Sequence, residues 1–576
     1  MQEKILNDNQ SRTHNALGNP VDFIGNGECG GKAGGLINIQ RKFDECIASG
    51  KIGDVSISIP QMTVIRTDIF ADFMEMNNLW DIALESNDDN YIAHLFQKAS
   101  LPPIIVGDLR SLISEAKEPL AVRSSSLLED SSEEPFAGVY ATKMLPNNQQ
   151  ALEVRFHKLI EAIKFVYSSL FFRDSRDYFR IIGKDVRNER MAIIIQEVVG
   201  NRYGDNFYPL ISGVGRSYNH YPTQKAKRED GVVNLALGLG KTIVDGGWSW
   251  IYCPAYPKSP PPYKSIREIL NSSQTSYWTV KMGQIPEFNP ISEIEFMEKS
   301  PLEDAEKDGT LRQVCSTYDY QNDVIRAGTQ YQGPRLLNFA PVLQYNTIGL
   351  NQAVKELLEI CKTHYNSEVE IEFAVKKKTD GYHLGFLQVR EMQVRKKFNK
   401  LNMEGSKDQS LLAESSMVLG DGERDDIYDI IMVKRDIFNA RNNHQIASEI
   451  AELNSLLVSQ TRPYLLIGYG RWGSADPWLG TPVSWSQISG AGAIIEATLP
   501  EMKPDLSQGS HFFHNLIAFN VFYLSIAEEK KKTIDWNWLN QQTIENERDF
   551  VNHLRLEIPL HIIVCSNSDQ GVILHE

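Results

Sequence analysis

The chain has 576 residues, of which 59 are Lys or Arg and 74 are Asp or Glu, so its formal net charge is −15. This length allows about three or four domains, and an apolar fraction of 42% with 23% charged residues excludes wholesale disorder. The acidic balance also argues against a general nucleic-acid binder, because neutralising phosphates requires a surplus of Lys and Arg on at least one face.

Cysteine spacing and hydropathy indicate the compartment. Six cysteines lie far apart, at positions 29, 46, 253, 315, 361 and 565, so the sequence has no CxxC pair and no zinc-ribbon spacing. The N-terminal segment is polar and lacks the apolar stretch of a signal peptide. No apolar run is long enough to cross a bilayer. We therefore expect a cytoplasmic protein with free thiols and no membrane partner.

The first elements along the chain are a glycine-rich turn, a helix, a strand and a second helix. Glycines crowd residues 25–35, and the periodic apolar residues that follow predict a helix entered from a turn. Residues 55–60 alternate as a strand that Pro60 ends. Thr67 is placed as the N-cap of a helix with apolar spacing.

Further strands are predicted along the rest of the chain. The pair of strands at 370–375 and 383–390 is joined by a turn at Asp380-Gly381, which is a strong hairpin signal. A polar stretch at 396–415 reads as a linker between domains. The other predicted strands lie near 120–124, 191–199, 231–237, 417–419, 428–433, 463–468, 493–498 and 560–565. The region 416–576 is therefore expected to be a separate α/β domain.

The glycine-rich turn carries a lysine that suits phosphate binding. The letters GGKAGGL at 30–36 let the backbone approach a phosphate closely, and Lys32 supplies a mobile positive charge. The motif is not a Walker A loop, because Ala33 stands where that motif has Ser or Thr. An ordinary turn into a helix with a surface lysine explains the same residues.

A second candidate begins at Arg123, which is placed at the end of a strand. Its planar guanidinium suits bidentate contacts with phosphate oxygens. The hydroxyl-rich residues that follow, together with Phe136 to Gly138, would form a loop able to close over phosphates. An ordinary polar loop is the alternative.

The predicted hairpin carries the third candidate. Residues two apart on a strand share a face, so Glu370 and Glu372 project together, as do Gln388 and Arg390. Carboxylates beside an amide and a guanidinium make a site for Mg²⁺ and the phosphates that it bridges. A surface cluster of ion pairs would use the same residues.

Taken in order, these segments resemble a known family, the N-terminal ATP-grasp domain of pyruvate phosphate dikinase and phosphoenolpyruvate synthase. That domain is shared with glucan water dikinase and rifampicin phosphotransferase. The resemblance covers about residues 20–395 and implies an α/β fold of two lobes, at 1–190 and 191–395. The matching segments are GGKAGGL, IPQMTVIRTDIFADFMEMNNL, LAVRSSSLLEDSSEEPFAGVYAT, IIIQEVV, ISGVG, GVVNLALGLGKTIVDGG, VEIEFAV and GFLQVREM.

The resemblance implies ATP and Mg²⁺ as ligands and assigns residues to each. Lys32 and Arg123 would contact the phosphates, residues 132–138 would form a lid, and the strand from Gln196 to Val199 would run along the adenine. Glu370, Glu372 and Gln388 would surround the metal. The full set assigned to the nucleotide is Lys32, Arg123, Gly138, Gln196, Glu197, Val199, Lys241, Glu372, Gln388 and Arg390, with Lys32, Arg123 and Arg390 also catalytic.

One residue departs from the family pattern. The family usually has an acid after Gly-Leu-Gly, whereas this chain has Lys241. A cation there either pairs with phosphate or weakens the site. Complete members also carry a phosphohistidine domain and a TIM barrel that binds pyruvate, and about 180 residues are too few for both. A self-contained phosphoenolpyruvate synthase is therefore not expected.

The last region offers a histidine as a phosphoryl acceptor. His511 follows Gly509-Ser510 at a predicted helix start, where free amides would stabilise a phosphorylated imidazole, and we expect it to be the catalytic histidine. His514 lies closer to the apolar surface and is the second choice. The stretch only weakly resembles the family's Thr-Ser-His motif, so a histidine that caps the helix is the simpler alternative. Two metal ligands at i and i+3 would be a third.

A glycine- and tryptophan-rich loop, GYGRWGSADPWLG at 468–480, is the other unusual segment. Its aromatic faces suit an apolar or sugar ligand and Arg471 suits an anion, although a tryptophan-anchored structural loop fits equally well.

We therefore expect an ATP-dependent phosphotransferase that passes a phosphoryl group to a histidine or to an external substrate. The alternatives are a catalytically weak ATP-binding sensor or scaffold, and the nucleotide-handling part of a split system. A homo-oligomer or a partner protein that carries the missing domains is compatible with each.

Overall fold

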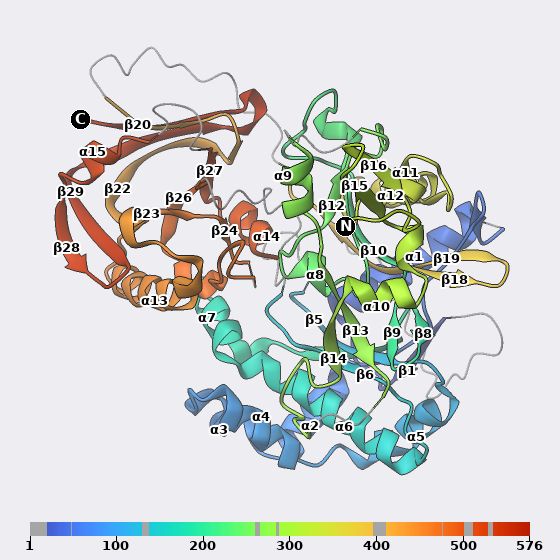
Figure 1. The fold of residues 1–576 in the computed structure, drawn as a ribbon. Coiled ribbons are helices and arrows are strands. Elements are labelled where there is room, and N and C mark those ends of the chain that lie inside the picture. The colour runs from blue at the N-terminus through green and yellow to red at the C-terminus, as the bar shows by residue number, and fades with distance from the viewer. Residues whose placement is uncertain are drawn as a thin grey trace.

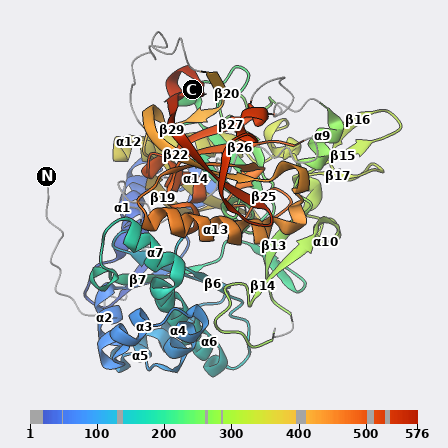
Figure 2. The ribbon, with the colours of Figure 1, turned by 90° about the vertical axis from the view of Figure 1, so that its left-hand side faces the viewer.

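The structure is a computed structural model of the 576-residue chain. It describes residues 20–47, 49–129, 138–259, 265–283, 287–394, 410–474, 476–499, 511–527 and 534–576. Its fold class is α/β, as predicted, with two sheet-based lobes and a further α/β region (Figure 1). Figure 2 gives the same fold after a quarter turn and shows the C-terminal strands packed in front of the remainder of the chain.

The first lobe is built on a five-stranded sheet with β7 at its centre. The run of Ile193 to Ile195 in β7 is fully buried, because both faces of this sheet are covered. In neighbour order the strands are β1 (Val21–Ile24), β4 (Met62–Ile65), β7 (Met191–Glu197), β5 (Leu120–Ser126) and β6 (Thr142–Leu145). One face packs on a group of helices, most of which lie below the sheet in Figure 1. These helices are α2 (Thr67–Met76), α3 (Leu79–Glu85), α4 (Asp89–Lys98), α5 (Val106–Glu115), α6 (Leu152–Ser168) and α7 (Arg173–Ile181).

The second sheet has seven strands and packs on two long helices, α1 (Gly30–Cys46) and α12 (Leu350–Tyr365). Helix α1 buries Ala33, Leu36, Ile39 and Phe43 along one stripe, which is the spacing of an amphipathic helix. The strands in neighbour order are β12 (Trp250–Tyr252), β11 (Val232–Ala236), β10 (Ile211–Arg216), β18 (Val369–Lys378), β19 (Gly381–Glu391), β3 (Val55–Ser58) and β2 (Lys51–Ile52).

The predicted hairpin is confirmed as β18 and β19, which pair antiparallel from Val369–Glu391 to Lys378–Gly381. The turn lies one residue earlier than expected, at residues 379–380, because Gly381 already belongs to β19.

Two small sheets flank the second lobe. One has the order β14 (Met297–Pro301), β13 (Ser276–Lys281), β9 (Asn206–Tyr208) and β8 (Asn201–Tyr203). The other has the order β16 (Val324–Ala327), β15 (Ser316–Asp319) and β17 (Arg335–Leu336). The short helices of this lobe are α8 (Lys241–Val244), α9 (Ile266–Asn271), α10 (Leu302–Lys307) and α11 (Ala340–Leu343).

The C-terminal region forms a nine-stranded mixed sheet. Its path runs β20 (Ser410–Ser415), β30 (Gln570–His575), β29 (Val551–Cys565), β22 (Asp421–Val433), β23 (Tyr464–Tyr469), β26 (Ala491–Ala497), β27 (Phe522–Ile526) and β21 (Val418–Leu419), with β28 (Thr543–Glu547) beside β29. Strands β22, β23, β26 and β27 are mutually parallel. The helices are α13 (Asn443–Ser459), α14 (His511–Ala518) and α15 (Trp536–Leu539), and β24 (Arg471–Trp472) pairs with β25 (Gly480–Thr481).

Sheet membership alternates along the chain. Strands β2 and β3, from the first 60 residues, join the second sheet, whereas β7, which begins at Met191, joins the first. Residues 410–415, at the end of the predicted linker, form the edge strand β20. The predicted domain boundaries stay a prediction, and each lobe takes strands from both sides of position 190.

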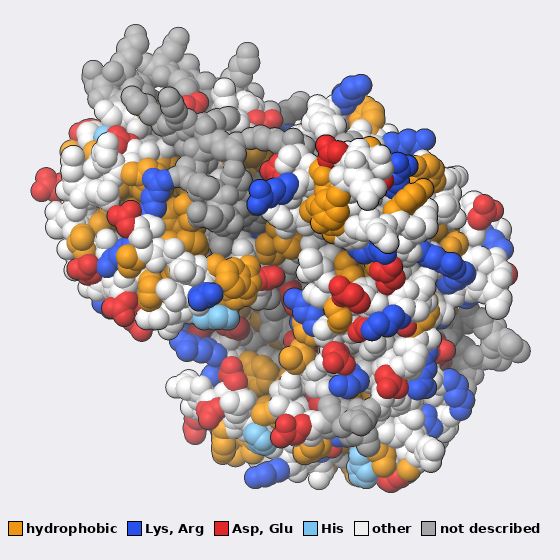
Figure 3. Space-filling view, in the orientation of Figure 1, with side chains coloured by type: hydrophobic (Ala, Val, Ile, Leu, Met, Phe, Trp, Pro, Cys, Tyr) orange, Lys and Arg blue, Asp and Glu red, His pale blue; other side chains and the backbone are white. Residues whose placement is uncertain are grey.

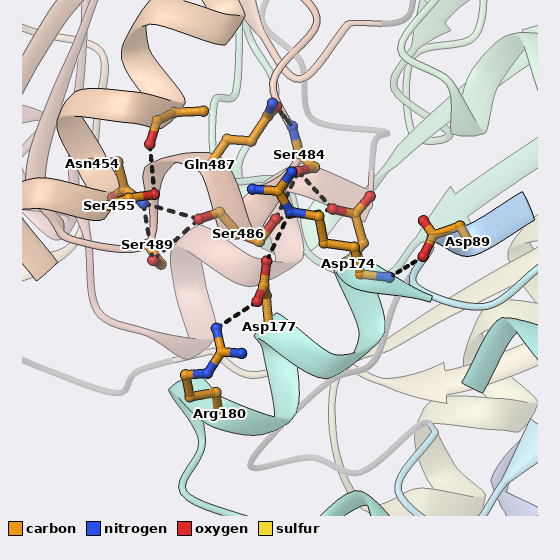
Figure 4. A network of polar contacts seen from close by, with 12 residues as sticks. Asp89, Asp174, Asp177, Arg180, Asn454, Ser455, Ser484, Ser486, Gln487 and Ser489 are labelled. Atoms are coloured by element: carbon orange, nitrogen blue, oxygen red, sulfur yellow. Dashed lines mark hydrogen bonds and ion pairs between the residues drawn. The ribbon is translucent and has the colours of Figure 1, made fainter. Parts of the chain in front are cut away.

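The C-terminal region packs against both lobes. On the first lobe, Asp174 of α7 accepts hydrogen bonds from Ser484 at 3.1 Å and from Ser486 at 3.0 Å (Figure 4). Tyr178 packs edge-on against Phe519 beside this network. On the second lobe, Arg228 pairs with Asp569 at 2.5 Å. The C-terminal region is thus held on two sides.

Basic and acidic side chains are interspersed over the face shown in Figure 3. None of the helices in the described part of the chain has the length and apolarity that a membrane span requires.

Candidate functional site

Lys32 lies in the first turn of helix α1, and the loop that leads into this helix is held by several hydrogen bonds. The preceding loop is held by the start of α2, where Asp68 accepts hydrogen bonds from the amides of Asn26 and Gly27. Thr67 was expected as the N-cap of α2, but it is the first helical residue after Arg66, because its hydroxyl accepts from the amide of Glu28 instead. The loop is therefore anchored to the sheet side of the first lobe.

The end of strand β5 fixes the start of helix α1 from the other side. Gly30 has φ of +74°, and a Cβ there would lie 1.8 Å from the carbonyl oxygen of Ser125, so only glycine fits. The hydroxyl of Ser125 accepts from the amide of Ala33 at 3.0 Å and donates to the carbonyl of Cys29 at 2.8 Å. The first turn of α1 is thereby pinned to β5.

Glu129 is a partner of Lys32 that the sequence did not single out. Its carboxylate lies 2.5 Å from the Lys32 ammonium, with the glutamate side chain 2% exposed. It also accepts from the Ser124 hydroxyl at 3.0 Å and from the Ser126 amide at 3.1 Å. A buried carboxylate with three donors holds Lys32 in one place, so the lysine points from α1 toward the first lobe.

Arg123 lies in the middle of β5 and not at its end, because the strand continues through three serines, of which Ser125 contacts the start of α1. Strand alternation places Ala121, Arg123 and Ser125 on the face of the sheet toward the second lobe. Arg123 crosses to the hairpin there, where it donates to Gln388 Oε1 at 2.7 Å and to the carbonyl of Leu387 at 3.2 Å. This contact joins the two lobes.

The hairpin brings Glu372 and Gln388 together as predicted, since they are cross-strand partners. A bulge follows this pair, because Phe373 pairs with Phe386 and leaves Leu387 as the extra residue. Glu372 Oε2 lies 3.7 Å from Arg123 Nη2, and its side chain is 20% exposed. Arg123, Glu372 and Gln388 therefore form one polar group at the junction of the lobes.

Glu370 lies two pairs further along the hairpin, opposite Arg390, and is buried between two arginines. Arg216 of β10 reaches Glu370 Oε2 at 2.5 Å, and Arg390 donates from Nε to Oε1 at 2.7 Å. Burial alone would raise the pKa of Glu370, but the charges of Arg216 and Arg390 hold it well below its usual range. With its oxygens so occupied, Glu370 acts in this geometry as an ion-pair centre, and its predicted role as a metal ligand stays a prediction.

A histidine from the C-terminal region contacts this cluster of Glu370, Arg216 and Arg390. His514 of α14 places Nε2 at 2.7 Å from Arg390 Nη2 and 3.2 Å from Glu370 Oε2. Nε2 therefore lies between a guanidinium, which can only donate, and a carboxylate, which can only accept. In the tautomer with its proton on Nδ1, Nε2 accepts from Arg390, and in the other tautomer it donates to Glu370. Burial and the charge of Arg390 lower the pKa of His514, which keeps the imidazole neutral.

Neither Arg216 nor His514 was assigned to the nucleotide site from the sequence. Arg216 directly follows the quoted segment ISGVG, and only its register opposite Glu370 brings it to this site. His514 was weighed as second to His511. Helix α14 begins at His511, whose side chain lies outside the described residues, as do residues 132–137 of the predicted lid. The assignments of His511 and Gly138 stay predictions.

An apolar layer lies between the lobes beside these charges. It is formed by buried side chains from β5, β9, β13 and their neighbours, with Met144 of β6 packed against it: Ala121, Val198, Phe207, Leu239, Val280 and Met282. Gln196 shares a face with Ala121, its cross-strand partner, and its amide nitrogen is buried without a hydrogen-bond partner. Apolar faces beside an unsatisfied amide suit a flat heterocycle such as a purine.

The other residues of the linking strand are engaged within the protein. The amide of Glu197 donates to the carbonyl of Gln61 and that of Val198 to Pro119, and burial raises the pKa of the Glu197 carboxylate. Val199 packs against Gly385, where a Cβ would lie 2.4 Å from its methyl group. Their predicted contacts with adenine stay predictions, and Gln196 is the best placed of the four.

Lys241, the departure from the family pattern, is paired with acids from two segments. Its ammonium lies 3.2 Å from Asp245 and 3.9 Å from Glu293. Burial opposes its charge, but Glu293 and Asp245 together raise the pKa of Lys241. Burial raises the pKa of both carboxylates in turn. The lysine therefore sits in a small acidic group at the start of α8.

The sequence comparison agrees with this geometry. The family described as pyruvate phosphate dikinase, AMP/ATP-binding domain, has a sequence model that matches residues 27–410. The chain belongs to this family. The match includes Lys32, the polar group of Arg123, Glu372 and Gln388 at the junction of the lobes, and Arg390. The domain that these residues build is therefore an AMP/ATP-binding domain. No curated protein matches the chain.

The C-terminal region, beyond the family match, holds a cluster with the appearance of a metal site. Asp429, Glu545 and His553 bring their ligand atoms within 4.8 Å of one another. Arg462 donates to Asp429 from Nε at 3.0 Å and to Glu545 from Nη2 at 2.8 Å, and Arg555 also pairs with Asp429. Two guanidinium groups already neutralise the two carboxylates, so the cluster is a structural charge network.

Glu496 of β26 leads to a pH-dependent prediction. The side chain is 1% exposed, and burial raises its pKa from 4.5 to about 7, while Tyr523 donates a hydrogen bond to it. Because the folded protein holds this proton more tightly, the stabilisation is full below the unfolded pKa and is lost as the pH rises through about 7. The loss amounts to about 3 kcal/mol. As the pH rises from 5 to 8, the free energy of unfolding of Glu496→Gln should therefore increase relative to that of the parent by about this amount. Denaturant unfolding at both pH values measures the difference. A parallel pH dependence in both proteins, or an equal gain in the exposed control Glu547→Gln, would exclude this assignment.

Proposed function

We propose that the protein is an ATP-dependent phosphotransferase that transfers a phosphoryl group to a histidine of its own C-terminal region or to an external substrate. Membership of the family supports nucleotide binding, and the transfer is the proposed step. The observation that carries it is the position of His514. Its Nε2 lies against Arg390 and Glu370, on the hairpin face that also carries Glu372 and Gln388.

The charges around the cluster of Glu370, Arg216 and Arg390 favour a phosphoryl donor at the junction of the lobes. Arg123 approaches it from the first lobe and Arg390 from the second, while Lys32 extends from α1 toward the first lobe. Positive groups at fixed positions stabilise the charge that develops on a transferring phosphoryl group. Neither Lys32 nor Arg123 is fully buried, since each side chain is 15% exposed, so a ligand can reach both.

The protonation state of His514 suits an acceptor. A neutral imidazole with its lone pair on Nε2 is nucleophilic without prior loss of a proton. In that tautomer Arg390 donates to this nitrogen, so an incoming phosphate that draws the guanidinium away would free the lone pair. In the transfer, Nε2 would form a bond to phosphorus, the P–O bond to the leaving nucleotide would break, and Nδ1 would release its proton.

The residues present also fit a divalent cation. Glu372 and Gln388 offer a carboxylate and an amide oxygen, which are ligands that Mg²⁺ accepts. A cation held there would supply positive charge against the phosphates. Glu372 would hold it from the hairpin, and Arg123 would then turn from Gln388 Oε1 toward the nucleotide.

A nucleotide sensor is the alternative, and Lys241 favours it. Lys241 stands where the family usually has an acid, so one carboxylate that could help to hold the metal is missing. The lysine is instead paired with Asp245 and Glu293. Such a protein would bind ATP, change conformation and leave the nucleotide intact.

The nucleotide products decide between these functions. The full chain is incubated with Mg·ATP, and the nucleotides are separated and quantified over time. Release of AMP or ADP in the absence of any other enzyme is expected for a phosphotransferase, and AMP indicates dikinase chemistry. ATP that binds but stays intact would rule out transfer and support the sensor.

A further inference from the structure

The glycine- and tryptophan-rich loop at 468–480 is not part of the inter-lobe site, yet it touches two of its elements. Arg471 is 4% exposed and donates from Nη1 to the carbonyl of Gly246 at 2.6 Å. Its guanidinium also lies over the ring of Trp248, 5.2 Å from the centroid, and Ser474 donates to the same carbonyl at 3.5 Å. The C-terminal region thus binds the turn at Gly246 to Trp248 of the second lobe through hydrogen bonds and a cation–π contact.

That turn is the one that follows Lys241. The amide of Asp245 donates to the carbonyl of Lys241, and Gly246 donates to Ile243. Gly246 adopts φ of +71°, which allows the chain to reverse and points its carbonyl at Arg471. Because the Asp245 side chain pairs with Lys241, a shift of this lysine is passed to the carbonyl that Arg471 binds.

On its other side, the loop packs against the helix that carries His514. Gly473 has φ of +74°, and a Cβ there would lie 2.6 Å from the ring of Phe512 in α14. Trp472, between these two contacts, is 1% exposed and fills the core beside β23 and β26. Such close packing moves as a unit and does not deform continuously.

A buried arginine that donates to main-chain carbonyls is an expensive way to hold two domains together. Taking a guanidinium from water costs more than burying an apolar side chain of similar volume. An arginine does, however, respond to the direction of the carbonyls it binds, because hydrogen bonds are lost when their geometry changes. The choice of residue therefore suits a contact that is sensitive to the position of the turn.

On the basis of the proposed phosphotransfer, we propose that residues 470–474 couple nucleotide binding near Lys241 to the position of the His514 helix, with Arg471 as the positioning residue. An anionic phosphate competes with Asp245 and Glu293 for Lys241 and so releases the turn. The carbonyl of Gly246 then moves relative to Arg471, and Gly473 transmits the shift to Phe512. The nucleotide site and the acceptor helix respond to each other through this loop.

Hydrogen exchange of the full chain tests the coupling without relying on activity. Exchange in α14 is measured by mass spectrometry with and without Mg·ATP. In the parent, ATP should change the exchange rate of α14 amides by about fivefold or more, the lower end of typical coupling between sites. The Arg471→Ala variant should still bind ATP and lose this response, and Arg471→Lys should recover part of it.

Two further variants make the result specific. Trp248→Leu removes the ring beneath the guanidinium from the other side of the contact and should also lose the response, which covers the case that Arg471→Ala does not fold. Trp478→Ala changes a side chain of the same loop that is 63% exposed and should keep it. If ATP binds the parent without changing α14, or if the Arg471 and Trp248 variants respond fully, the coupling is overturned and phosphotransfer is untouched. If the parent does not bind ATP, both proposals fail.

Discussion

Replacing Arg123 by alanine is expected to weaken ATP binding by about 2 kcal/mol or more, or roughly 30-fold, because a charge-assisted contact with phosphate is lost. In the structure the guanidinium crosses between the lobes to Gln388, so it stands where the two lobes meet. Titration calorimetry with ATP measures the change directly. Arg123→Lys should lose part of this affinity, since lysine keeps the charge and not the planar fork.

A matched control separates this effect from a general loss of charge. Arg180 lies on α7, where its side chain is 78% exposed and pairs with Asp177. Arg180→Ala should bind ATP as the parent does. An unchanged ATP affinity in folded Arg123→Ala would show that β5 does not face the phosphates.

The Glu372→Gln variant is expected to lose turnover by about two orders of magnitude or more, on the scale seen when a group that stabilises transferred charge is removed. Glutamine keeps the size of the side chain and removes the charge that would hold Mg²⁺. Binding of ATP without metal should change little, because the apolar layer between the lobes and the arginines are intact. Comparing titrations with and without Mg²⁺, together with product formation, measures both.

Glu391→Gln is the control for this hairpin, because Glu391 is exposed one residue beyond Arg390 and faces the opposite side of the strand. It should retain turnover. Parental turnover in Glu372→Gln would place the metal elsewhere.

Local features of the site were predictable because the residues concerned are close in sequence. The glycines before Lys32 predict a turn into a helix, and the hairpin follows from two alternating strands around Asp380-Gly381. The register then brings Glu372 opposite Gln388 without further information. The family resemblance, which the comparison confirms, ordered these pieces along the chain.

Long-range partners were not predictable. Glu129 begins a stretch of acids and serines, and only the fold shows that its carboxylate turns inward to Lys32. Arg216 and His514 meet at Glu370 from strands and helices more than 100 residues apart in sequence. Sequence reasoning placed the first turn of α14 correctly as a helix start and favoured His511, because it weighed the helix N-terminus without knowing what the next turn would face.

The loop at 468–480 shows the same limit. Its composition suited a small ligand or a structural anchor, whereas Arg471 and Gly473 contact a turn and a helix of the protein itself. A buried arginine and a buried tryptophan are compatible with either use, and the partner is decided by how the C-terminal region docks.

Phosphoryl labelling of the full chain tests phosphotransfer most directly. The parent, His514→Asn and His511→Asn are incubated with Mg·ATP, kept at alkaline pH and measured by intact-protein mass spectrometry. Our account predicts an acid-labile phosphate on the parent and on His511→Asn, and none on His514→Asn. A label that survives in His514→Asn and disappears in His511→Asn would contradict the role of His514, and an unlabelled parent with intact ATP would contradict phosphotransfer itself.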